Sequence, residues 1–141
     1  GAAYVFERAA GIWHQRARLL PPDGDSNDLF GLAVAVSGST IAVSAPYAEE
    51  SERGVVHVFE RQGSEWPHVA RLVSPSGQGR LLGGSLSMSG DRLLASASDH
   101  PIAAGTTAGI ALVFERTQAG WLWSTNLEPV ILNPLVASDI V

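Results

Sequence analysis

A four-residue motif, Val-Phe-Glu-Arg, occurs three times in this chain and constrains its fold more than any other feature. The copies begin at Val5, Val58 and Val113, so the repeated unit is 53 to 55 residues long. Each copy has a tryptophan seven residues after its phenylalanine and a leucine six residues after that tryptophan. A fixed period of this length is typical of arrays built from one repeated supersecondary unit. Because the tryptophans recur in register, we expect them to pack between neighbouring units.

Inside each unit the hydrophobic residues alternate with a period of two, which indicates β-strands. Ser-Gly turns join the first two strands, and a second hairpin follows. In the first complete unit we expect strands at 32–36, 40–45, 55–59 and 66–72. The last strand is predicted to carry four side chains on one face: Trp66, His68, Ala70 and Leu72. The strand at 32–36 has large apolar side chains on one face and small ones on the other, which suits a sheet packed between two others.

Residues 9–20 also allow an amphipathic helix, because their apolar residues can be placed at helical spacing. The equivalent stretches of the other units argue against it. Pro67 directly follows the second tryptophan, and residues 121–125 have the composition of a strand. We therefore predict a strand here as well.

Four antiparallel strands repeated at this period describe the blade of a β-propeller. Three segments of the sequence, Phe30-Gly31, Ser44-Ala45-Pro46 and residues 1–8 with the following Trp13, resemble the FG-GAP repeats of integrin α-subunit-like propellers. The closest resemblance is to the bacterial variety, in which a Ser-Gly turn precedes a strand that ends in Ala-Pro. The resemblance implies an all-β fold, an incomplete β-propeller of about two and a half four-stranded antiparallel blades.

The same resemblance divides the single repeat domain, 1–141, into four parts. These are a half-blade (1–20), two blades (30–73 and 82–127) and a tail (128–141). The second blade departs from the family pattern, with Leu82-Gly83 in place of Phe-Gly. In integrin-like propellers calcium lies in an Asp-rich loop between the first two strands, where this chain has Ser37-Gly38-Ser39. A hard dication needs six or more oxygen ligands, so we expect no metal and no other cofactor.

Composition excludes several functions. The chain has no cysteine and no lysine, which removes thiol and Schiff-base chemistry and the phosphate-binding lysine of a P-loop. Its net charge of −5, with scattered arginines, argues against a nucleic-acid partner. No apolar run approaches the roughly 20 residues that span a bilayer, so membrane insertion is not expected. The start at Gly1, without a methionine, led us to expect a processed or excised piece.

Few residues are candidates for chemistry. A loop with Asp23, Asp25, Asn27 and Asp28 resembles a calcium loop but lacks the glycine and glutamate that such a loop requires, so a solvated turn is expected. Asp99 and His100 form the one adjacent acid and imidazole pair, and no serine in a nucleophile-elbow context accompanies them. We therefore expect no enzyme activity. Trp123 has no counterpart in the other units, which makes it a candidate ligand contact.

Family geometry places the loops 21–29, 74–81, 47–54 and 99–109 at one rim of the blades. In the first complete blade this rim is acidic around a tyrosine and suits a basic partner surface. Candidate ligand-binding residues there are Asp23, Asp25, Tyr47, Glu49, Glu50, Glu52 and Arg53, together with Asp99, His100 and Trp123 from the next blade. The expected function is a binding, adhesion or assembly module of an extracellular or cell-surface protein, with a protein or glycan ligand. Two alternatives stay open, a piece of a secreted hydrolase and a structural spacer.

Two and a half blades are too few to close a ring, since propellers have about four to eight. The half-blade lacks its two inner strands and leaves an edge unpaired along residues 4–7. The tail contains two short apolar runs that could act as substitute inner strands for another chain. We therefore expect either self-association or truncation from a longer propeller.

Overall fold

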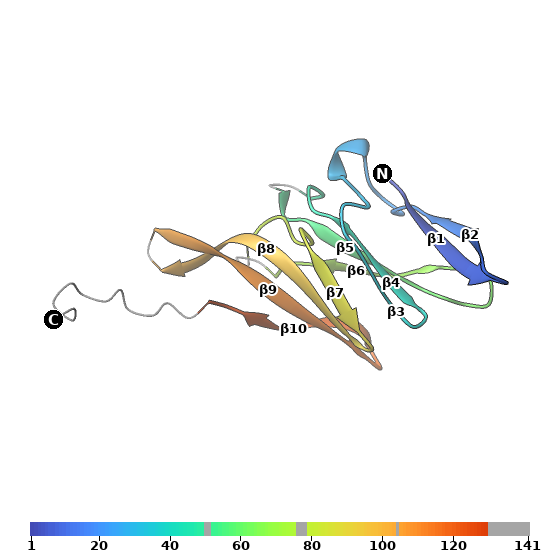
Figure 1. The fold of residues 1–141 in the computed structure, drawn as a ribbon. Helices are drawn as coiled ribbons and strands as arrows, with labels where there is room; N and C mark the ends of the chain where they lie inside the picture. Colours follow the sequence, from blue (N-terminus) through green and yellow to red (C-terminus); the bar gives the residue numbers. More distant parts are fainter. Residues whose placement is uncertain (50–51, 76–78, 104, 130–141) are drawn as a thin grey trace, which may run out of the picture.

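The computed structural model describes residues 1–49, 52–75, 79–103 and 105–129 and confirms the all-β, partial propeller fold. Three antiparallel sheets follow one another along the chain (Figure 1). The first is the hairpin of β1 (Ala3–Ala9) and β2 (Ile12–Leu19). The second contains β3 (Val34–Ser37), β4 (Thr40–Ala45), β5 (Val55–Glu60) and β6 (His68–Val73). The third contains β7 (Leu86–Ser89), β8 (Arg92–Ala103), β9 (Thr106–Thr117) and β10 (Gly120–Leu127).

Each four-stranded sheet is a meander in which chain neighbours are also sheet neighbours. The middle sheet, β3–β6, lies between the hairpin β1–β2 and the sheet β7–β10 (Figure 1). A 3-10 turn at Ser26–Asp28 is the one helical element among the described residues. The stretch 9–20, for which a helix was the alternative, forms the tip of the first hairpin and β2. The apolar tail from residue 130 onward lies outside the described residues.

The hydrophobic core consists of two layers, one between each pair of neighbouring sheets. All six residues of β4 are buried, because this strand has a sheet against each of its faces. Ile41 and Val43 pack in the layer shared with β1–β2, whereas Ala42 packs in the layer shared with β7–β10. Burial on both faces explains why Ile41, Ala42 and Val43 follow one another without a polar residue between them.

The last strand of each unit contains a β-bulge, which corrects one prediction. Phe59 pairs with His68, but its neighbour Val58 pairs with Ala70, so that Val69 is an extra residue in β6. The insertion shifts the alternation of faces. Trp66 therefore packs toward β1–β2, and Leu72 packs toward β7–β10. The prediction that Trp66, His68, Ala70 and Leu72 share one face is wrong for this reason.

The same bulge is present in the other two units. In the first hairpin Phe6 pairs with Gln15 and Val5 pairs with Ala17. In the third sheet Trp123 pairs with Phe114 and Thr125 with Val113. The bulge thus places the motif tryptophan and the motif leucine of each unit on opposite faces of its sheet.

A glycine sets the distance between neighbouring sheets. Gly83 has φ +94, and a Cβ built on it would lie 2.5 Å from the Cβ of Ser44 in the preceding sheet. Gly31 has φ +96 and approaches the carbonyl oxygen of Ala2 in the same way. A side chain at either position would strain the backbone and separate the sheets. This requirement explains why the Gly of the Phe-Gly pair persists in the second blade although the Phe has become Leu82.

The segment 99–109 was predicted as a rim loop, and here the structure differs. Strands β8 and β9 continue through most of it and extend past the sheet as a long hairpin. Pro101 is accommodated because the pairing of β8 with β9 is irregular between Ala97 and His100 and again between Pro101 and Ala103. Asp99 and His100 therefore belong to a strand.

The burial of the motif tryptophans generates the first prediction. Trp121 is buried and its Nε1 donates a hydrogen bond to Glu60 Oε1 at 3.2 Å, whereas Trp66 is only half-buried. We expect Trp121→Ala to lower the free energy of unfolding by about 3 to 5 kcal/mol, as for other buried large aromatic residues. Urea denaturation measures this loss. Trp123→Ala, which removes a more exposed tryptophan from the same strand, should cost less than about 1 kcal/mol. Equal losses for the two variants would contradict the packing described above.

Candidate functional site

Backbone hydrogen bonds hold the loops of the middle sheet together at one end of its strands. The amide of Tyr47 donates to the carbonyl of Asp28 at 3.3 Å. The amides of Leu81 and Leu82 donate to the carbonyls of Glu52 and Arg53 at 2.9 and 3.0 Å. We call the described residues of the loops 21–29, 47–54 and 74–81 the rim. These hydrogen bonds join the three segments to one another.

Two of the rim aspartates shape their own loop. Asp25 accepts a hydrogen bond from the amide of Asn27 at 2.7 Å, and its own amide donates to Asp28 Oδ2 at 3.0 Å. This reciprocal arrangement is a capping box around the short 3-10 turn. The carboxylates of Asp25 and Asp28 are therefore engaged by backbone N–H groups. The described residues contain no group of three or more acidic, histidine or cysteine side chains that could hold a metal ion.

Two arginines, one from β6 and one within the rim itself, offset part of its negative charge. Arg71, from β6, forms an ion pair with Glu49 and lies 3.6 Å from Asp23. Arg80 forms a 3.0 Å ion pair with Glu52. The sequence alone does not indicate these contacts, because the arginines are 22 and 28 residues away from the glutamates that they contact.

Tyr47 is the aromatic side chain of the rim, and it is partly exposed. It lies two residues after the end of β4 and precedes two glutamates with left-handed backbone, Glu49 (φ 75) and Glu52 (φ 55). Residues other than glycine seldom adopt this conformation, so the loop has a defined shape. Arg53 donates a hydrogen bond to the carbonyl of Ser74 at 3.0 Å. Glu50, also a candidate, lies outside the described residues.

A pair of histidines lies below the rim and was not recognised as a pair from the sequence. His57 Nδ1 and His68 Nε2 are 3.1 Å apart, between the cross-strand neighbours β5 and β6. The rings of Phe30 and Phe59 contact the pair edge-on. Two nitrogens at this distance require one donor and one acceptor, so at least one imidazole is neutral.

The pKa of His57 is lowered to about 4, mainly by burial and in addition by the nearby His68. Asp23 and Asp28 oppose this shift but do not reverse it. Burial also lowers the pKa of His68, again against the effect of Asp23. The pair is therefore neutral near pH 7 and packs as part of the core under the rim.

The remaining candidates lie in the third sheet, apart from the Tyr47 loop. His100 is buried, and its Nε2 is 3.1 Å from Glu128 Oε1. Its neighbour Asp99 is exposed, with a left-handed backbone (φ 54). The two side chains do not form a dyad among the described contacts. Trp123 lies within β10, where its Nε1 donates to Asn126 Oδ1 at 3.0 Å.

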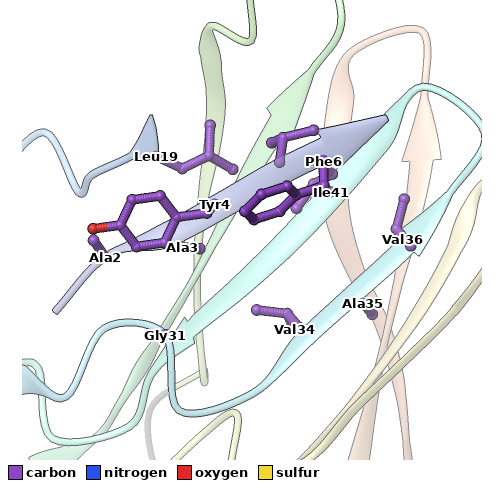
Figure 2. A pocket seen from close by; sticks show the side chains of 11 residues that line it. Ala2, Ala3, Tyr4, Phe6, Leu19, Gly31, Val34, Ala35, Val36 and Ile41 are labelled. Atoms are coloured by element: carbon purple, nitrogen blue, oxygen red, sulfur yellow. The ribbon is translucent and has the colours of Figure 1, made fainter. Parts of the chain in front are cut away.

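An apolar groove of about 380 Å³ runs along the free edge of β1. Figure 2 shows its two walls, with Tyr4 and Phe6 on β1 and with Val34 and Val36 on β3. In the complete sheets this space next to the third strand is filled by the two inner strands. The groove is therefore the place that the missing half of the first sheet would occupy. Within the part of the chain that is described, no helix is long and apolar enough to cross a membrane.

Comparison with known proteins supports the repeat assignment. Residues 13–59 match the family model of the FG-GAP repeat. This segment extends from the first motif tryptophan to the phenylalanine of the second motif, and it includes β3, β4 and the loop with Tyr47. No curated protein matches the chain.

The histidine pair predicts a loss of stability in mild acid. The folded-state pKa of His57 is about 4 and its unfolded value is about 6.5, so the unfolded state binds more protons between these values. The free energy of unfolding should fall as pH drops from about 6.5 toward 4, by up to about 3 kcal/mol. Urea denaturation at a series of pH values measures it.

His57→Leu, which copies Leu112 of the next unit, should remove most of this pH dependence, whereas replacing the exposed His14 by Gln should leave it unchanged. If the wild-type and His57→Leu proteins show the same dependence, the pair is not its cause.

Metal dependence is the next prediction. A ligand that binds only the folded state raises the melting temperature. If the rim carboxylates stabilise their own loop and bind no cation, adding calcium or a chelator should change the melting temperature by less than about 1 °C. Differential scanning fluorimetry with added calcium and with EDTA provides the measurement. A decrease of several degrees on chelation would show that a cation binds.

Proposed function

Since this chain is an FG-GAP repeat protein, we propose that it is a non-catalytic binding module that presents its rim to a protein ligand. FG-GAP units form propellers, whose sheets hold loops of variable sequence in fixed positions. The observation that carries the proposal is the half-exposed Tyr47 in the same loop as Glu49, which belongs to the Asp23, Glu49 and Arg71 cluster. Tyrosine is one of the residue types that most often carry a large share of the binding energy at protein interfaces.

The charges of the rim favour a protein with a basic surface as the ligand. Asp23 and Glu49 share one arginine, Arg71, so the cluster keeps a net negative charge. The carboxylate of Glu52 is paired with Arg80 at an exposed position, where an ion pair contributes little and exchanges partners readily. Such a surface attracts a basic partner and repels a sulfated glycan.

The proposed location is extracellular or at the cell surface, as is typical of proteins with FG-GAP repeats. The hydrolase alternative would bring several carboxylates together around one cleft. Instead Asp28 is engaged in the capping box and Asp99 lies in β8 of the next sheet. A structural role is compatible with the two outer faces of the array, which carry exposed apolar side chains.

A binding screen against protein and glycan arrays, followed by titration of any hit, tests the proposal. Tyr47→Ala should weaken binding at least tenfold, because truncation of a central aromatic anchor commonly costs more than about 1.4 kcal/mol. Asp23→Lys should weaken binding and reduce its dependence on salt.

Trp123→Ala serves as the matched control, since it removes an exposed aromatic side chain outside the rim. A ligand that binds the Tyr47→Ala and Asp23→Lys variants as tightly as the wild type would place the binding site elsewhere. A ligand lost only with Trp123→Ala would assign the site to β10.

A further inference from the structure

The burial of two aromatic residues in each unit depends on whether another sheet precedes that unit. In the third sheet Phe114 and Trp121 are buried against the middle sheet. The equivalent residues of the first hairpin, Phe6 and Trp13, are 51% and 65% exposed. The sequence is the same at these positions, and only the neighbour differs. We call the surface of β1–β2 with Tyr4, Phe6, Arg8 and Trp13 the front face.

In the same way, the burial of the motif leucine depends on whether another sheet follows the unit. Leu19 and Leu72 are buried against the sheet that comes after them. Leu127, at the same position in the third unit, is 52% exposed, and Leu122 of the same strand is also exposed. We call the surface of β7–β10 that carries Leu122, Leu127 and Glu115 the rear face.

Ion pairs between the repeated motifs join each sheet to the next. Arg61 NH1 lies 2.7 Å from Glu7 Oε1 of the preceding hairpin. Arg116 NH2 lies 3.1 Å from Glu60 Oε2 of the preceding sheet. The arginine of each Val-Phe-Glu-Arg motif thus contacts the glutamate of the motif before it.

Two charged residues of the motifs, the arginine of the first copy and the glutamate of the last, take no part in this series and lie at opposite ends of the array. Arg8 lies on the front face, where its Nε donates to the carbonyl of Gly11 at 3.5 Å. Glu115 lies on the rear face and accepts two hydrogen bonds from Arg92 of its own sheet. The two faces therefore carry opposite charges at matching positions of the repeat.

A motif glutamate that already forms an ion pair with an arginine of its own sheet can form a second ion pair with the motif arginine of the next sheet. Glu7 does so: its Oε2 lies 3.3 Å from Arg16, and its Oε1 binds Arg61. The contact between Arg92 and Glu115 is therefore compatible with an additional arginine at Glu115.

We propose that the front face of one copy of this chain packs on the rear face of a second copy. In this contact Arg8 of one copy pairs with Glu115 of the second copy, and the exposed Phe6 and Trp13 cover the exposed leucines. The junction repeats the arrangement that the chain itself contains twice, between its first and second and between its second and third sheets. It is a heterologous, head-to-tail contact, which produces a ring if the rotation closes and a filament if it does not.

Charge reversal in the 141-residue chain tests this contact. Sedimentation velocity over a range of concentrations should show self-association of the wild-type protein. Arg8→Glu alone and Glu115→Arg alone should each weaken association at least tenfold. An equimolar mixture of the two variants should restore it, because one junction regains its native charges and the other has the same pair with the signs exchanged.

The reversal Glu65→Arg, at the exposed tip of the β5–β6 hairpin, is the matched control and should leave association unchanged. Trp13→Ala should also weaken association, because it removes apolar contact area without changing the charge of the front face. Circular dichroism and thermal melting establish that each variant folds.

A wild-type chain that is monomeric at all concentrations overturns the proposal. A mixture that associates no better than its components overturns it as well, because a front-to-front contact would give that result.

Discussion

The packing of one sheet on the next is the interaction on which this structure depends. Each described sheet is only two or four strands wide, and its apolar side chains become buried only where another sheet covers them. A large apolar side chain contributes about 1.5 to 3 kcal/mol when it is fully buried. The exposed ion pairs between sheets contribute at most about 1 kcal/mol each. The apolar contacts therefore supply the stability, and the charged pairs fix which residues face each other.

The overall architecture could be predicted from the sequence because the repeat shows the same pattern three times. Strand β4 was predicted with its observed bounds, since a Ser-Gly turn and an Ala-Pro pair mark its ends. The distribution of side chains between the two faces could not be predicted beyond the bulge. The extra residues are Arg16, Val69 and Ser124, which share no chemical property that would reveal the insertion.

The candidate site was predictable only in part, for a related reason. The resemblance to a known family grouped the loops of the rim, but it gave no information on which side chains meet there. Arg71 contacts Glu49 and Asp23 from β6, and no motif in the sequence of that strand indicates the contact. The pair His57 and His68 depends on cross-strand register, and the bulge at Val69 sets that register.

The placement of the middle sheet between two neighbours has a consequence for local unfolding. In arrays of this kind each unit is stabilised by its own strands and by nearest-neighbour contacts. The amides of β4 and β5 exchange with solvent only after contacts on two faces are broken, whereas those of β1 and β2 need contacts on one face to break. Hydrogen exchange should therefore slow from the first hairpin toward the centre of the array, so that the hairpin opens while the middle sheet is still folded.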